Sequence, residues 1–162
     1  YTAGSGAATG NTITLSGLNG YGSTHLYGGF SSGTGAATGN MLKVTTSNNG
    51  TASISNFEKM HFVLGTGIHS SDTMLHAWHI NGTLDWSKIT VENGAAWASN
   101  SEESKRVRLF MTDSPFNLTN YTAPTGIVSG NHEYAITSDA VGTGNVTASN
   151  IYFDSNKFQN RY

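Results

Sequence analysis

The sequence carries the phrase Gly-Ser-Gly-Ala-Ala-Thr-Gly-Asn at residues 4–11 and the phrase Gly-Thr-Gly-Ala-Ala-Thr-Gly-Asn at residues 33–40. Seven of the eight positions are identical, at an offset of 29 residues. The chain is rich in glycine, alanine and threonine, so short matches can also arise by chance. Repeats of about 20–50 residues are typical of solenoids and related arrays, in which each unit stacks on its neighbours.

The residues that follow each copy indicate a true repeat. Thr12-Ile13-Thr14-Leu15 and Met41-Leu42-Lys43-Val44 both alternate in the manner of a strand with one buried face. Ile13 aligns with Leu42 and Leu15 with Val44, so the inward phase is the same in both copies, whereas a slip of one residue would turn these side chains to solvent. We therefore predict that the four side chains stack in one core column.

The beginning of the chain falls inside a repeat. Tyr1-Thr2-Ala3 aligns with Phe30-Ser31-Ser32, and the opening of the second copy, residues 26–29, has no counterpart in the first. The alignment predicts that further repeats precede this chain in a longer protein.

Composition favours an all-β fold and argues against several partners. Charged residues make up 11% of the chain, against about 25% in ordinary soluble domains. Glycine, serine, threonine and asparagine take their place, and these residues suit turns and strands better than helices. The net charge of −2 provides no basic surface for nucleic acid. No apolar run is long enough to insert into a membrane, and without cysteine the chain has no disulfides.

The two parts of the chain differ in composition. Residues 1–50 hold 12 of the 20 glycines and one charged residue, Lys43, whereas residues 51–162 hold all ten acids and all three tryptophans. We assign residues 1–56 to Gly-rich β-solenoid repeats and residues 57–162 to a C-terminal β segment that continues or caps the solenoid. Further strands are expected at 51–55, 61–64, 73–80, 89–92, 107–111, 133–137 and 145–154, and the best helical stretch is 95–108.

With these residues in view, the chain resembles a known family. The repeat from Tyr27-Gly28-Gly29-Phe30 through residues 35–44 resembles the repeats of large autotransporter (type V secretion) passenger domains. The stretch Gly50-Thr51-Ala52-Ser53-Ile54-Ser55-Asn56-Phe57-Glu58-Lys59-Met60-His61-Phe62 resembles the sequence that closes such repeats, and Tyr152-Phe153-Asp154 is similar to a later strand of the family. The resemblance covers most of the chain and is strongest from residue 27 to 76.

The resemblance implies a single-stranded right-handed β-helix with a more irregular C-terminal capping segment, located just before an outer-membrane translocator barrel. It implies a non-enzymatic adhesin stalk and a stable C-terminal folding segment at the bacterial cell surface or in a secreted protein. The expected partners are the chain's own C-terminal outer-membrane β-barrel in the parent protein and host-cell or other surface ligands. No cofactor is expected.

Two motifs could carry chemistry but fit a structural role better. Gly29-Phe30-Ser31-Ser32-Gly33 matches the Gly-x-Ser-x-Gly nucleophile elbow, yet no helix follows it and the equivalent of Ser31 in the first copy is Thr2. Asp72, His76 and His79 could be drawn as a metal site, but on a strand His76 and His79 would point to opposite faces. Neither motif predicts a catalytic or metal site.

Paired carboxylates, which glycosidases and lyases require, are also not evident. Glu102 and Glu103, with Lys105, Arg106 and Arg108, form the only dense charge run, which suits a solvated face. The other acids considered lie on separate predicted elements: Asp113, Glu133, Asp139 and Asp154. The sequence thus singles out no catalytic group, no metal ligand and no ligand-binding residue.

Two other function classes stay open. A carbohydrate-binding or phage-fibre β-sandwich would place a glycan site around Trp78, Trp86 or Trp97 and would show no structural repeat across residues 1–50. Core or cap packing is the more common role of tryptophan in a domain of this size. A β-helical polysaccharide-degrading enzyme would carry an acid cluster on one face.

Overall fold

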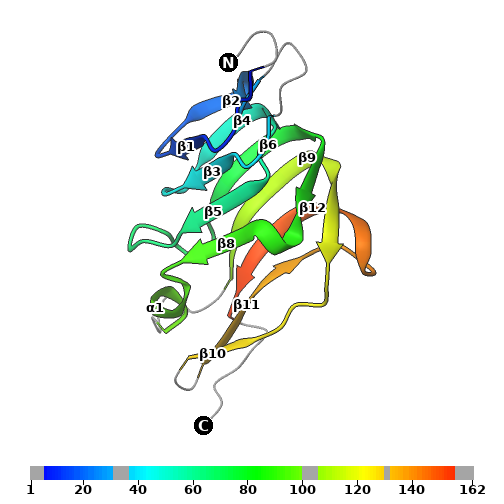
Figure 1. Ribbon diagram of the computed structural model, residues 1–162. Coiled ribbons are helices and arrows are strands. Elements are labelled where there is room, and N and C mark those ends of the chain that lie inside the picture. Colours follow the sequence, from blue (N-terminus) through cyan, green and yellow to red (C-terminus); the bar gives the residue numbers. More distant parts are fainter. Residues whose placement is uncertain (1–5, 31–36, 100–105, 130–131, 156–162) are drawn as a thin grey trace.

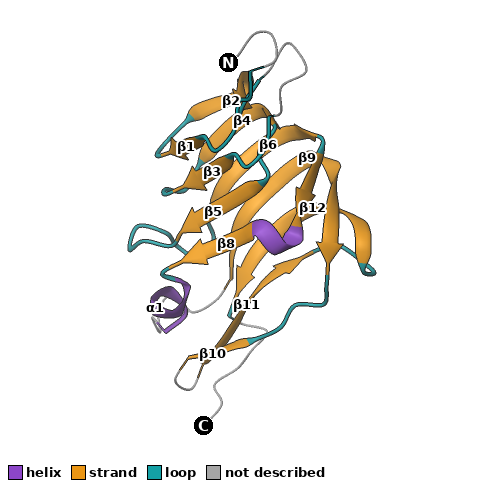
Figure 2. Ribbon diagram, viewed as in Figure 1, coloured by secondary structure: helices purple, strands orange, loops and turns teal. Residues whose placement is uncertain are grey.

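The chain alternates between two β-sheets, seen one in front of the other in Figure 1. This computed structural model describes residues 6–30, 37–99, 106–129 and 132–155. The strands are β1 (Thr12–Leu15), β2 (Asn19–Tyr27), β3 (Met41–Val44), β4 (Asn49–Ser55), β5 (Lys59–Val63), β6 (Thr73–Asn81), β7 (Thr83–Asp85), β8 (Ile89–Glu92), β9 (Arg106–Tyr121), β10 (Ile127–Ser129), β11 (His132–Ser138) and β12 (Gly144–Asp154). Two short helices complete the structure, the 3-10 helix η1 (Trp86–Lys88) and α1 (Gly94–Ser99), drawn in purple in Figure 2.

The first sheet has the order β1-β3-β5-β8, and every neighbouring pair in it is parallel. The second sheet contains the parallel run β2-β4-β6-β9, with the short strand β7 also parallel to β9. After β9 the pattern changes, because β12, β11 and β10 follow in antiparallel pairs. The N-terminal strands therefore lie at one end of the stack and the antiparallel strands at the other (Figure 1).

The register of the first sheet confirms the core column predicted from the repeat. Ile13 pairs with Leu42 and Leu15 with Val44. The column then continues through Met60 and Ile89 in one row, and through Phe62 and Val91 in the other. Leu42, Val44 and Phe62 are fully buried, while Ile13 and Val91 pack partly buried at the two ends.

The repeated Gly-Asn phrase has a structural reason. Gly10 and Gly39 occupy equivalent positions in the two copies, and both adopt the left-handed backbone region, with φ of 70° and 69°. The next residues, Asn11 and Asn40, are joined across the sheet, where Asn40 Oδ1 accepts hydrogen bonds from Asn11 N at 2.9 Å and from Asn11 Nδ2 at 3.0 Å. Glycine makes the corner at low steric cost, and Asn40 connects the second corner to the first.

Asn49 connects three successive passes of the chain. Its buried Oδ1 accepts hydrogen bonds from the backbone N–H groups of Gly17 and Leu18, at 2.9 and 2.7 Å. Its Nδ2 donates to the carbonyl oxygens of Thr46 and Met74, at 2.9 and 3.1 Å. One side chain therefore satisfies corner backbone groups that would otherwise lack partners away from water.

A single hydrophobic core lies between the two sheets and extends to the C-terminal strands. At that end Phe153 of β12 packs against Trp97 of α1, with ring centroids 5.7 Å apart, and against Tyr134 of β11 at 5.2 Å. Trp97 also donates its Nε1–H to the carbonyl oxygen of Ile68 at 2.9 Å. The antiparallel strands and α1 thus carry the aromatic part of the core.

The expected all-β class is confirmed at the level of a mostly β protein with several sheets, and most expected strands lie where the sequence placed them. The expected helix over 95–108 is confirmed at residues 95–99 and wrong at residues 106–108, where β9 begins. β2 was not expected, because residues 19–27 contain two glycines and no apolar alternation. Both sheets continue across the expected boundary at residue 56, because β3 pairs with β5 and β4 pairs with β6.

Candidate functional site

An exposed aromatic cluster lies on the outer face of the second sheet. On β6, Leu75 and Ala77 belong to the core, so the alternating residues His76 and Trp78 point outward. Tyr21 of β2 approaches both, with ring centroids 4.4 Å from His76 and 5.6 Å from Trp78. Asp113 of β9 completes what we call the outer-face cluster: Tyr21, His76, Trp78 and Asp113.

An irregularity in β2 brings Tyr21 to this position. Between Gly20 and His25 the strand advances five residues while β4 advances only two, from Thr51 to Ser53. The extra residues bulge from the ladder, and bulges commonly redirect side chains next to functional sites. Gly50 of β4 leaves the space that Tyr21 crosses, because a Cβ at residue 50 would lie 2.8 Å from Tyr21 Cβ.

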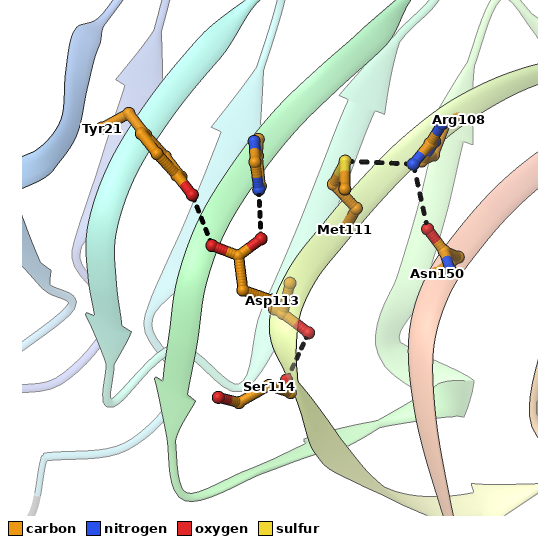
Figure 3. Close-up of polar contacts among 8 residues, drawn as sticks. Tyr21, Arg108, Met111, Asp113, Ser114 and Asn150 are labelled. Carbon is orange, nitrogen blue, oxygen red and sulfur yellow. Dashed lines mark hydrogen bonds and ion pairs between the residues drawn. The ribbon is translucent and has the colours of Figure 1, made fainter.

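Hydrogen bonds fix the cluster across three strands. The Tyr21 hydroxyl donates to Asp113 Oδ2 (Figure 3). His76 Nε2 lies 2.8 Å from Asp113 Oδ1. The hydrogen bond from Tyr21, followed by that from His76, lowers the pKa of the Asp113 carboxyl. The same contact with Asp113, with smaller contributions from desolvation and from the negative charge, raises the pKa of the Tyr21 phenol. Asp113 is therefore ionised and Tyr21 neutral at neutral pH.

We expect the Tyr21 phenol to titrate at lower pH in an Asp113→Asn variant than in the native protein. The raised pKa of Tyr21 means that its contribution is present at neutral pH and lost as pH rises through that pKa. The lowered pKa of Asp113 means that its contribution is lost as pH falls through it. Ultraviolet difference titration measures the phenol, and a Tyr21→Phe variant assigns the signal. An unchanged titration in Asp113→Asn would show that the contact is not formed in solution.

A second polar network follows the same face toward β12. Arg108 Nη1 donates to Asn150 Oδ1 at 3.3 Å and contacts Met111 Sδ at 3.1 Å, as Figure 3 shows. Asn150 Nδ2 in turn donates to Asp139 Oδ2 at 3.0 Å. Arg106 at the start of β9 lies over the ring of Tyr152, 4.2 Å from its centroid. These contacts engage the long side chains with one another, which favours a structural role for this part of the face.

The three tryptophans, Trp78, Trp86 and Trp97, have different environments in the structure. Trp97 is buried in the core against Phe153, and Trp86 packs at 4.8 Å against Tyr121, so these two take the packing role. Trp78 is 43% exposed and Tyr21 beside it is 46% exposed. The sequence did not single out Tyr21, because its partner Asp113 is 92 residues away and the bulge that joins them leaves no local pattern.

The other motifs are not assembled into a site. Asp72 accepts a hydrogen bond from the backbone N–H of His69 at 2.8 Å, and His76 is directed to Asp113 instead. In the part of the chain that the structure describes, no group of three His, Asp or Glu side chains could hold a metal ion. Ser31 of the elbow motif and the charged residues 102, 103 and 105 lie outside the described residues.

The remaining acids considered from the sequence stay apart from the cluster. Asp139 holds the β12 backbone, accepting from the N–H groups of Ser149 and Asn150. Glu133 lies in β11 and Asp154 at the end of β12. Among its four members the outer-face cluster contains one carboxylate, whereas acid–base hydrolysis of a glycoside uses two.

No family model, curated protein or solved structure matches this chain. Within the described ranges, no helix is both long and apolar enough to cross a membrane.

Proposed function

We propose that this chain is a segment of a single-stranded right-handed β-helix that serves as a non-enzymatic display segment of a bacterial cell-surface or secreted protein. One observation carries the proposal: β1-β3-β5-β8 and β2-β4-β6-β9 are two parallel stacks between which the chain alternates. Each pass through both sheets then forms one coil. Parallel strands joined by a crossover connect with right-handed chirality in about 98% of cases.

Such a coil suits a stalk. The backbone groups of each coil are paired with those of its neighbours, so repeats can be added along one axis without a new core design. The antiparallel strands β12, β11 and β10 end the parallel pairing of the second sheet, and Phe153 and Trp97 close the core there. This arrangement supports the proposed role of the C-terminal part as a cap and stable folding segment.

The proposed partners and location follow from the autotransporter resemblance. They are a C-terminal outer-membrane β-barrel in the parent protein and surface ligands of other cells, with no role for nucleic acid or cofactors. The parallel register between Thr12–Leu15 and Met41–Val44 favours this function over a β-sandwich, which predicts no repeat in that region. The single carboxylate of the outer-face cluster favours it over a polysaccharide-degrading enzyme.

Duplicating one repeat tests the proposal. We would insert a second copy of residues 11–39 after Gly39, which preserves the phase of the Gly-Asn corner. Because a coil adds its own ladder and core, we expect the inserted residues to fold as an extra turn and to resist proteolysis. The control carries the same 29 residues in scrambled order, and we expect its insert to be cut at least about tenfold faster.

Cleavage of both inserts at the same rate would contradict the coil. Esterase, glycosidase and protease assays on the native chain should stay at background. Turnover that a Ser31→Ala substitution abolishes would instead assign the chain to an enzyme.

A further inference from the structure

We infer that the outer-face cluster is a carbohydrate-binding site that takes the pyranose ring of a neutral sugar. The inference does not depend on the β-helix proposal, because it rests on the geometry of four side chains and one bulge. Its first support is the bulge itself. The parallel strands pair regularly at β4 and β6, and the break in β2 falls where Tyr21 and Gly22 meet Trp78.

The bulge brings the backbone of β2 close to the ring of Trp78. Gly22 adopts a φ of 84°, and a Cβ there would lie 3.1 Å from Trp78 Cζ2. The rings of Tyr21 and Trp78 are nearly perpendicular, at 87°, and both are close to half exposed. The two rings thus form an open corner of aromatic surface on rigid strands rather than a packed core contact.

Aromatic surface of this kind suits a sugar ring. The face of an aromatic ring carries partial negative charge, which attracts the polarised C–H groups on the apolar face of a pyranose. The edge of the same sugar carries hydroxyl groups that need hydrogen-bond partners. A site for such a ligand must therefore place polar groups beside the rings.

The cluster has these polar groups. Asp113 accepts from Tyr21 and His76, but an ionised carboxylate offers about four acceptor positions, and this side chain is 45% exposed. A hollow of about 260 Å³ adjoins the cluster at Tyr21 and His76, and polar residues, among them Asn19, Asn48 and Thr73, line it. Trp78 and Asp113 lie beside this hollow and do not line it. Since Tyr21 is already held by Asp113, little ordering of the site is needed on binding.

The size and charge of the site favour one neutral sugar over a protein partner. The hollow lies just below the range of about 300–1,000 Å³ that is common for drug-sized ligands, so it suits a single ring. Specific protein partners bury about 800 Å² on each side, whereas the exposed aromatic surface here comes from two side chains. No lysine or arginine lines the hollow, and the His76 ring is directed to Asp113, so the site has no free basic side chain to pair with an acidic sugar.

Nuclear magnetic resonance titration tests the inference. The probes are the methyl pyranosides of glucose, galactose, mannose and N-acetylglucosamine. We expect at least one of them to shift the indole N–H of Trp78 with a Kd of about 1–10 mM, which is typical of one small polar ring on an open site. Trp78→Ala removes that signal, so its titration is followed at the backbone amide of Gly22, which lies beside residue 78. This variant should bind at least about tenfold more weakly than the native protein.

The matched control is Tyr27→Ala, which removes another tyrosine of β2 with 49% exposure, similar to the 46% of Tyr21. We expect it to leave the affinity unchanged. Gly50→Ala should weaken binding without removing any polar group, because the added methyl displaces Tyr21. The unchanged folding of each variant is checked from its thermal midpoint.

Three outcomes would overturn the site. The first is that none of the four sugars shifts the Trp78 signal, and the second is that binding survives Trp78→Ala in a folded variant. The third is a Trp78 signal that moves with protein concentration alone, which would assign the cluster to contacts between copies of this chain. All three leave the repeat-duplication experiment unaffected, so failure of the site and failure of the proposed function are distinguishable.

Discussion

Leu42→Asp should destabilise the protein by about 4–5 kcal/mol, enough to unfold much of it at ambient temperature. Leu42 is fully buried between Ile13 of β1 and Met60 of β5 in the first sheet. An aspartate there would be a charge without a partner in an apolar column, and its desolvation is costly unless it takes up a proton. Chemical denaturation, or the loss of ellipticity where the variant does not fold, measures the effect.

The neighbouring residue provides the control. Lys43 aligns with Thr14 and His61, which lie on the other face of the strands. Lys43→Asp should therefore change stability by no more than about 0.5 kcal/mol. Leu42→Ala keeps the experiment informative if the aspartate variant cannot be purified, with an expected loss of about 2–5 kcal/mol from the cavity. Equal and small effects at residues 42 and 43 would mean that the register of β1 and β3 is wrong.

The phase of this column could be predicted because it depends on a local property. Side chains in a strand alternate with a period of two, so the positions of Ile13 and Leu15 indicate which face of the strand is buried. The 29-residue offset then places Leu42 and Val44 beside them, as the register confirms. The Gly-Asn corner is equally local, since the left-handed conformation of Gly10 and Gly39 is what glycine allows most readily.

β2 could not be predicted on the same grounds. Its sequence, from Asn19 to Tyr27, contains two glycines and no apolar alternation, so its own propensity for a strand is low. It is a strand because β4 offers backbone partners at both of its ends, to residues 19–20 and 25–27, on either side of the bulge. The end of the helix expected over 95–108 is a strand for a different reason. Val107 is buried in the core as part of β9, and that burial outweighs helical propensity.

The outer-face cluster depends on the relation between distant segments. Tyr21, His76 and Asp113 come from three strands that are far apart in the sequence, and only the stacking order of the second sheet brings them together. The bulge in β2 then decides that Tyr21 reaches across Gly50. A reading of Trp78 alone could suggest a sugar-binding role, but it could not supply the tyrosine or the carboxylate that give the site its geometry.

Asn49→Leu is expected to cost about 3 kcal/mol, although leucine is similar in size and more hydrophobic. The Asn49 side chain is buried and makes four backbone hydrogen bonds, with Gly17, Leu18, Thr46 and Met74. Each backbone group left unsatisfied away from water costs about 1–3 kcal/mol. Water can reach Gly17, which is exposed, but Met74 is fully buried, so the loss is only partly compensated. Urea denaturation measures it.

Asn48 provides the matched control, since it precedes Asn49 and its side chain is exposed. Its φ of 62° lies in the left-handed region, which glycine adopts freely, so Asn48→Gly should stay within about 0.5 kcal/mol of the native protein. Hydrogen exchange sharpens the test, because Asn49→Leu should speed exchange at Leu18, whose N–H donates to Asn49 Oδ1 at 2.7 Å. If Asn49→Leu were as stable as Asn48→Gly and Leu18 stayed protected, then Asn49 would not join successive passes of the chain, and the corners would be held by backbone pairing alone.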